Sequence, residues 1–340
     1  MIVDSWDDKL ERLSVYQKDI YFYEAYCRLY NSESRKARAF IYENGSSIYI
    51  LPFMQGELPN TNGLSDFETP YGYGGPVTND VDLQFLQQAE QALISDCRKE
   101  GIIAGFVRFH PILENKQFAT GIFTIIPDRL TVAIDLTAAE EQIWESQLHS
   151  KNRNTIRKAK NSGLEFYLDE SFEHLGQFIE LYKHTMSRVG ADAFYDFGEP
   201  YFESLAANLA RKAFIGEVYA GKELVAAAIF MHDGPWGHYH LAGSKYEWAK
   251  IGANNLLVYE AALALKRKGA QKLHLGGGTD SSPDNSLLAF KKKFSPYYYQ
   301  FSIGKCIFLD EEYEKICNGW IEKYPEKQKQ YGHLILKYRY

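Results

Sequence analysis

Apolar residues along this chain follow two spacings, which predict helices and strands in alternation. The stretch Gln84–Glu100 repeats apolar residues three and four apart, as the buried face of a helix does. Ala39–Ile50 carries apolar runs on both sides of a Glu-Asn-Gly turn and predicts a hairpin. The first region then reads as hairpin, Gly/Pro-rich loop at Gly56–Pro76, helix, and strands at Ile102–Phe109 and Leu130–Leu136.

The second region, from residue 138, predicts a similar order of elements. Helices are expected at 138–148, through the basic segment before Gly163, and at 172–188, 201–212 and 253–268. Strands are expected at 164–168, 213–220, 224–232, 238–243, 272–275, 290–294 and 297–308, followed by a terminal helix from 310. The two regions thus look like duplicates of one α/β (α+β) unit. We predict tandem domains at 1–137 and 138–340, each a mixed, mostly antiparallel sheet flanked by helices.

Composition narrows the class of protein. The chain has 340 residues, 45% hydrophobic and 24% charged, with a formal net charge of −6. These are globular values, and an acidic chain does not coat nucleic acid with a general positive field, so no DNA partner is expected. The acidic N-terminus does not resemble a signal peptide, and no run of apolar residues is long enough to span a bilayer. The four cysteines lack metal-site spacing, so we expect a reduced, cytoplasmic setting and no metal.

Several short motifs occur in an order and spacing that carry a family resemblance. In the second half they are RNTIRKA from Arg153, HYHLAGS from His238, ANNLL from Ala253, LGGG from Leu275, and LLAFKKKF from Leu287; in the first half they are YGGP from Tyr73 and RFHP from Arg108. With these motifs the chain resembles the Fem-type transferases and their relatives in the GNAT acyltransferase superfamily. The resemblance implies two tandem GNAT-like domains. It also implies transfer of an amino acid from aminoacyl-tRNA to an amine of a peptidoglycan precursor in the cell envelope.

The sequence leaves two classes of acyl donor possible, aminoacyl-tRNA and acyl-CoA. GNAT acetyltransferases bind the pyrophosphate of coenzyme A in a Gln/Arg-x-x-Gly-x-Gly/Ala loop at the start of a helix, which attracts anions. The corresponding loop here, Ala249–Asn254, keeps only the central Gly252. This favours aminoacyl-tRNA, with possible tRNA contact, over an acyl-CoA acting on an amino sugar, and no tightly bound cofactor is expected. A binding module that has lost the chemistry is the third alternative.

Three residues are candidates for the chemistry. The resemblance places Lys291 near the transferred carbonyl, where it would stabilise an oxyanion. In the predicted strand Phe290–Phe294, Lys291 and Lys293 would share one face; the alternative is an edge strand protected by lysines. Asp280, in the glycine-rich loop, is a candidate general base. His240 is a candidate for proton transfer, sharing a strand face with His238, although structural hydrogen bonding would also explain it.

Candidate substrate-binding residues come from the basic segment and from the motifs. Arg153 and Arg157 recur at helical spacing and suit a phosphate; the alternative is a solvated face that pairs with the acidic helix before it. Arg188 would clamp an anion. Tyr71 and Tyr73 would stack on a base or sugar in a cleft between the domains. The remaining candidates lie in the family motifs: Tyr239, Asn255, Gly277 and Phe290.

Overall fold

The computed structural model describes residues 1–190, 197–282 and 284–340, and it divides the chain into two compact units. The first unit comprises Met1–Asp128 and Phe301–Tyr340, and the second comprises Arg129–Gln300. In the described part of the chain, no helix combines the length and apolar character that a membrane span requires.

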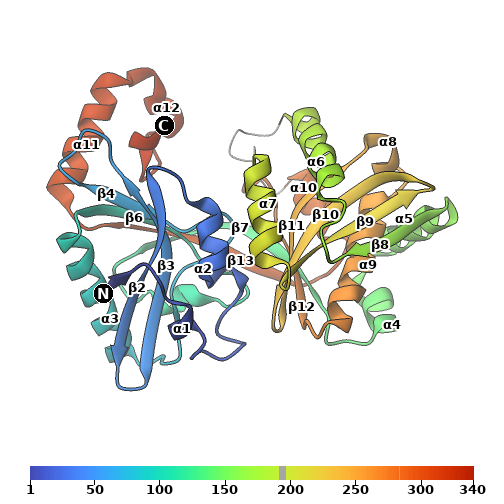
Figure 1. Ribbon diagram of the computed structural model, residues 1–340, viewed down its shortest axis with the longest axis horizontal. Coiled ribbons are helices and arrows are strands. Elements are labelled where there is room, and N and C mark those ends of the chain that lie inside the picture. The colour runs from blue at the N-terminus through green and yellow to red at the C-terminus, as the bar shows by residue number, and fades with distance from the viewer. Residues whose placement is uncertain (191–196, 283) are drawn as a thin grey trace. The chain divides into compact units, whose positions relative to one another are not determined.

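The first unit is a mostly antiparallel sheet with helices on both faces (Figure 1). Its strand order is β1-β2-β3-β4-β6-β13, with β5 beside β3, and only the pair β4–β6 is parallel. Helix α3 packs over one face through a core of aromatic and aliphatic residues, whereas α1, α2 and α11 cover the other. The strands are β1 (Ile2–Val3), β2 (Arg35–Asn44), β3 (Ser47–Glu57), β4 (Ser65–Glu68), β5 (Val77–Thr78), β6 (Ile102–Arg108) and β13 (Tyr298–Ile307). The α-helices are α1 (Asp7–Leu10), α2 (Glu24–Cys27), α3 (Leu83–Lys99), α11 (Asp310–Lys323) and α12 (Gln328–Tyr331).

The second unit repeats this plan. Its strand order is β7-β12-β11-β10-β9-β8, and only the pair β11–β12 is parallel. The strands are β7 (Thr124–Asp135), β8 (Leu164–Asp169), β9 (Ala213–Ala220), β10 (Glu223–Asp233), β11 (Trp236–Ser244) and β12 (Lys272–Gly277). The α-helices are α4 (Glu140–Gln142), continued by a π-turn at Ile143–Gln147, α5 (Ser150–Asn161), α6 (Leu175–Val189), α7 (Glu199–Leu209), α8 (Tyr246–Ala249), α9 (Ala253–Arg267) and α10 (Ser286–Lys291). Each unit is therefore a mixed, mostly antiparallel sheet flanked by helices, and the predicted fold class is confirmed.

The units exchange one strand each, and this changes the predicted domain boundary. β7 follows β6 in the chain but pairs with β12, whereas β13 follows β12 but pairs with β6. Residues 301–340 accordingly pack with the first unit, instead of ending a second domain at 138–340 as predicted. Local sequence pattern does not reveal this, because strand partners are chosen by long-range pairing.

Another prediction that the structure corrects is the strand at Phe290–Phe294. Asn285 caps a short helix instead, its side chain accepting a hydrogen bond from the backbone N–H of Leu288 at 3.0 Å. The helix α10 then runs to Lys291 and buries Leu288 and Lys291, which are three residues apart and so share a face. Two aromatic residues around three lysines had suggested a strand at the edge of a sheet.

Close packing of α6 on β11 sets the shape of the second unit. A Cβ atom on Gly243 would lie 2.7 Å from the carbonyl carbon and oxygen of Leu181, in the α6 backbone. Backbone atoms cannot rotate away, so only glycine fits this position. Around it, the hydroxyl of Thr185 donates to the carbonyl of Leu181 and receives the N–H of Ser244 at 2.9 Å.

We predict that Gly243→Ala lowers the free energy of unfolding by about 1–3 kcal/mol, because the added methyl group forces α6 away from β11. Urea unfolding followed by circular dichroism measures the change. Gly176→Ala is the matched control, since a Cβ there meets nothing within 4 Å and alanine favours the helix. A Gly243→Ala protein as stable as the control would contradict this packing.

Candidate functional site

The candidate site in the second unit lies where β12 ends and α10 begins. Gly277 and Gly278 allow close approach here: a Cβ on Gly277 would lie 2.8 Å from the carbonyl oxygen of Leu130, and one on Gly278 would lie 2.5 Å from Asn285. Asn285 also donates through its amide to the hydroxyl of Thr279 at 2.7 Å. These contacts of Gly277, Gly278 and Thr279 therefore hold the start of α10 close to the end of β12.

Lys291 is the central charged group of this turn. Its side chain is buried, and its Nζ donates a hydrogen bond of 2.7 Å to the carbonyl oxygen of Gly277. Burial and, as the smaller cause, the positive charge of Arg129 together lower the pKa of Lys291 to about 7. The ammonium form is therefore present near neutral pH but is in balance with the free amine, which is the range in which a group can serve in acid–base or oxyanion chemistry.

Arg129 was not predicted from the sequence. Its guanidinium donates to the carbonyl oxygen of Gly278 at 3.1 Å, so two cationic side chains hold successive carbonyls of the loop. No motif marks Arg129 in the sequence: it precedes an ordinary strand pattern and lies about 150 positions away from the loop it contacts.

The two candidate proton acceptors have different surroundings. Asp280 is exposed, and hydrogen bonds from the N–H of Ser282 and the side chain of Asn285 lower its pKa. His240 is half-buried beside Tyr201, whose hydroxyl lies 2.7 Å from its Nε2. Burial, and then the neighbouring His238, lower the pKa of His240 to about 3, so it is neutral at physiological pH. A β-bulge between β10 and β11 adds one residue at His240, since Ile229 pairs with Leu241 and Phe230 pairs with Tyr239.

The basic segment forms the helix α5, as predicted, but its two arginines differ. Arg153 is half-buried, and its guanidinium donates to the backbone carbonyls of Trp144, Glu145 and Leu148. It thereby terminates the helical turns before α5. Arg157 is exposed and lies 5.2 Å from the centre of the Trp144 ring. The exposed cations of α5 are Lys151, Arg157, Lys158 and Lys160, and of these Lys160 pairs with Glu260 at 2.6 Å.

Asn255 belongs to a buried amide chain that fixes the segment after α10. Its side chain donates to Asn152 at 2.7 Å, and the amide of Asn152 donates to the carbonyl of Lys293 at 3.1 Å. Phe290 packs against Phe294 at a ring distance of 5.2 Å. These contacts place Asn255, Phe290, Gly277 and Lys291 in one neighbourhood of the second unit.

The other predicted binding residues lie apart from this neighbourhood. The ring of Tyr239 packs on Phe230, on the core face of the sheet, and burial raises its pKa. Arg188 is exposed at the end of α6, 5.4 Å from the ring centre of Tyr246.

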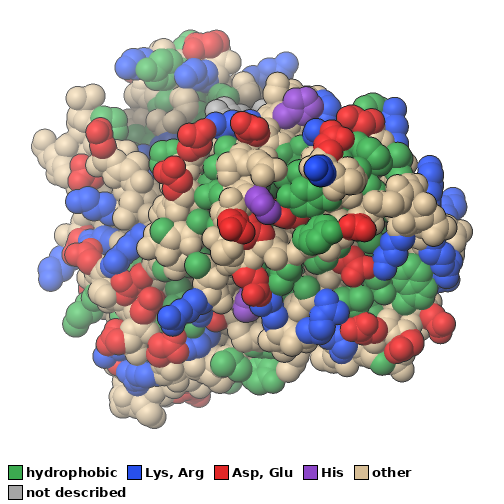
Figure 2. All heavy atoms as spheres, turned by 45° about the vertical axis from the view of Figure 1, so that its right-hand side comes forward, with side chains coloured by type: hydrophobic (Ala, Val, Ile, Leu, Met, Phe, Trp, Pro, Cys, Tyr) green, Lys and Arg blue, Asp and Glu red, His purple; other side chains and the backbone are tan. Residues whose placement is uncertain are grey.

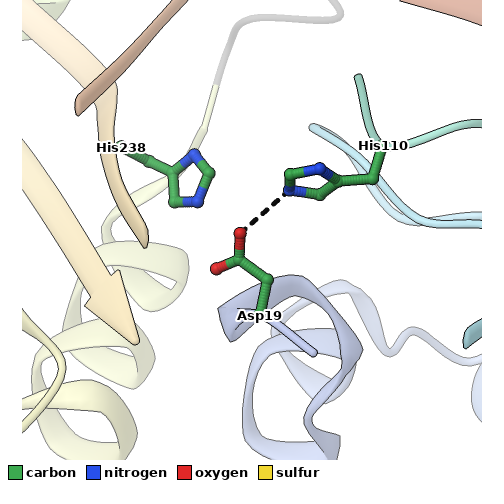
Figure 3. A group of neighbouring side chains, drawn as sticks. All are labelled: Asp19, His110 and His238. Carbon is green, nitrogen blue, oxygen red and sulfur yellow. Dashed lines mark hydrogen bonds and ion pairs between the residues drawn. The ribbon is translucent and has the colours of Figure 1, made fainter. Parts of the chain in front are cut away.

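Tyr71 and Tyr73 lie in the first unit, beside a buried Asp–His pair. The carbonyl of Tyr71 accepts from the hydroxyl of Tyr26 at 2.7 Å, and the ring of Tyr73 meets the His110 ring at 5.5 Å. His110 and Asp19 are both fully buried, and His110 Nε2 lies 2.9 Å from the Asp19 carboxylate (Figure 3). Since His110 Nδ1 accepts the N–H of Leu113, the proton of the neutral ring lies on Nε2 and is donated to Asp19. This pair orders the RFHP motif.

Comparisons with known proteins agree with this architecture. Residues 147–292 match a family model described as an acetyltransferase (GNAT) domain. Among solved structures, the chain is similar to FemX, with a TM-score of 0.72 and 15% identity over 89% of this chain and 96% of that one. It is also similar to L-PGS from Bacillus licheniformis, with a TM-score of 0.58 and 14% identity over 89% of this chain and 92% of that one. No curated protein matches its sequence.

The C-terminal domain of a putative lysylphosphatidylglycerol synthetase from Agrobacterium fabrum has the same fold, with a TM-score of 0.57 and 14% identity over 88% of this chain and 92% of that one. At sequence identities this low, the structural similarity shows a shared fold and does not by itself show a shared function. Together with the matched domain, it supports an acyltransferase of GNAT type. The predicted resemblance is confirmed by the matched GNAT domain together with the similarity of the fold to that of FemX.

We predict that stability depends on pH through Lys291. Unfolding returns its pKa from about 7 to its ordinary value of 10.5, so between these values the unfolded chain binds more protons than the folded one. Folded protein therefore gains stability as pH rises from 7 to 9, by at most about 1.4 kcal/mol per pH unit, and the gain is absent from Lys291→Met. Urea unfolding of both proteins at pH 6, 7, 8 and 9 measures the difference. Parallel pH curves would contradict a titration of Lys291 near neutrality.

Proposed function

We propose that this protein transfers an aminoacyl group from aminoacyl-tRNA to an amine of a cell-envelope precursor, with Lys291 as the oxyanion donor. The observation that carries the proposal is the buried Lys291 amine, held by the Gly277 carbonyl at the end of β12 within the matched GNAT domain. In this reading Lys291 has the position that the family resemblance assigns to it.

The chemistry needs little from the protein beyond position and charge. The amine attacks the ester carbonyl, a C–N bond forms, and negative charge collects on the carbonyl oxygen. The ammonium of Lys291 donates a hydrogen bond to that oxygen, in a site where burial strengthens the interaction. The C–O bond to the ribose then breaks, the amine loses a proton, and the departing oxygen gains one. His240 and Asp280 remain the candidate groups for carrying that proton.

Packing at the start of α9 favours an ester donor over acyl-CoA. A Cβ on Gly252 would lie 2.6 Å from Cγ2 of Thr155 and 2.9 Å from its carbonyl oxygen. Helix α5 thus packs directly against the turn where a GNAT enzyme would hold a pyrophosphate. This crowding adds to the loss of the loop motif around Gly252 in the sequence.

The exposed cations of α5 give an aminoacyl-tRNA a local basic surface. Lys151, Arg157 and Lys158 are exposed, so their charges are available to phosphates. Basic and acidic side chains are interspersed over the face of the molecule in Figure 2, which argues for a limited contact instead of a long nucleic-acid track.

The proposed acceptor class rests on the similarity of the fold to FemX. The similarity to FemX supports a cell-envelope precursor as the amine substrate. A second candidate function keeps the same site but uses an acyl-CoA and an amino sugar; the description of the matched domain as an acetyltransferase favours it.

A donor assay separates these candidates. The purified protein is given charged tRNA or acetyl-CoA, together with an amine-bearing peptidoglycan precursor or an amino sugar, and product is followed by mass spectrometry. Product from charged tRNA supports the proposal. Turnover with acetyl-CoA, together with saturable binding of coenzyme A in calorimetry, would favour the second function. No product from any pair of substrates would favour a binding module.

We predict that Lys291→Met lowers kcat about 10²–10³-fold, as loss of one oxyanion donor does, with little change in KM for the donor. Lys293→Met is the matched control, since Lys293 lies two residues away with an exposed side chain. The acceptor amine titrates in the same way with both proteins, so its effect cancels in the ratio of the wild-type rate to the Lys291→Met rate. This ratio should fall as pH rises through about 7, because Lys291 then loses the proton of its ammonium group. Rates within a few-fold of each other would exclude Lys291 from the reaction.

A further inference from the structure

An open groove lies at the edge of the sheet in the second unit, away from the turn that holds Lys291. It has a volume of about 790 Å³ and is formed by the end of β8, the turn into α6, and β9. Its charged and titratable lining residues include four acids, together with one histidine and one lysine: Asp169, Glu170, Glu173, Glu217, His174 and Lys222. The groove contains none of the residues assigned to acyl transfer.

Three metal-ligating side chains meet at this groove. Asp169, His174 and Glu217 each present one donor atom, and these atoms lie within 4.8 Å of one another. The Nδ1 atom of His174 is 3.1 Å from each carboxylate oxygen of Glu217. Such spacings are close to those between ligands on one ion, since bonds of about 2.0–2.2 Å to a common metal hold neighbouring ligands near 3 Å apart.

The carboxylate of Asp169 is fixed in place by the turn. It accepts the N–H and the hydroxyl of Ser171, both at 3.1 Å, and the N–H of His174 at 2.9 Å. The last bond ties the backbone of one ligand to the carboxylate of another. This kind of support orients the donors of a metal site before the ion arrives.

The charges at this site do not balance. Glu217 is 1% exposed and Asp169 is 7% exposed. Among the residues that the structure describes, His174 forms the one ion pair with Glu217, and no lysine or arginine pairs with either carboxylate. Hydrogen bonds from the turn offset part of the charge of Asp169. The two carboxylates still share His174 as their one charged partner, so a bound cation would add to the positive charge that they face.

We propose that Asp169, His174 and Glu217 bind one divalent transition-metal cation of the zinc class at this groove. One imidazole nitrogen and two carboxylate oxygens suit zinc and its neighbours in the first transition row, and water from the open groove completes the coordination. The ion replaces the proton that His174 otherwise shares with Glu217, and it ties the β8–α6 turn to β9.

The first experiment titrates chelator-treated protein with Zn²⁺ in calorimetry. We expect one equivalent to bind wild type, and binding at least tenfold weaker in His174→Gln and in Glu217→Gln, since each removes a ligand. Glu173→Gln is the control that removes the same charge as Glu217→Gln. Glu173 lines the groove but is not one of the three proposed ligands. His184→Gln is the control for an exposed histidine on the same helix. Both controls should bind as wild type does.

A second measurement guards against loss of folding in the variants. Circular dichroism establishes that each variant is folded, and thermal unfolding is then compared with and without Zn²⁺. Zn²⁺ should raise the Tm of wild type and of Glu173→Gln, but not that of His174→Gln. Absence of binding to wild type up to millimolar Zn²⁺ or Mn²⁺, or equal affinity in folded His174→Gln, would overturn the site. Neither result depends on acyl transfer, so the proposed function is tested separately.

Discussion

The hydrogen bond from Lys291 to the carbonyl of Gly277 is the constraint around which the second unit's site is arranged. Burying an amine is costly, and the cost appears as a pKa lowered to about 7. The hydrogen bond to the Gly277 carbonyl offsets part of that cost, and glycine allows the turn to pack closely enough to form it. The Asn255–Asn152 amide chain then fixes the segment after α10. This fixed position is the preorganisation that the oxyanion role proposed for Lys291 requires.

Strand exchange explains how two similar units share one chain. In each unit, a meander leads through a helix to a strand that lies parallel to the last strand of the meander. The strand that completes each sheet comes from the other part of the sequence, β13 for the first unit and β7 for the second. The unit with the GNAT match therefore begins near Arg129 and ends near Gln300. Folding of either sheet requires pairing between distant segments, which stabilises the arrangement but conceals it from local sequence pattern.

Local pattern was informative wherever a residue's immediate neighbours determined its structure. The helices at α3, α5 and α9 and the meander from Ala213 to Gly243 agree with the predictions, because the spacing of apolar residues reflects a buried face directly. It was misleading at Phe290–Phe294, where the three lysines between two aromatic residues suggested an edge strand but Asn285 caps a helix instead. It was also silent on Arg129 and on the Asp169–His174–Glu217 group, since their neighbours in space are remote in sequence.

By itself, the sequence determined the fold class and the family resemblance, because motif order and residue spacing are properties of the chain alone. Lys291 became a candidate through that resemblance. Only the tertiary structure decided what each charged side chain contacts. It assigned Arg153 to backbone carbonyls while leaving Arg157 exposed, although both lie one helical turn apart in the same motif. It also gave Lys291 its lowered pKa. Burial and long-range hydrogen bonding set these properties, and both arise only when distant segments pack together.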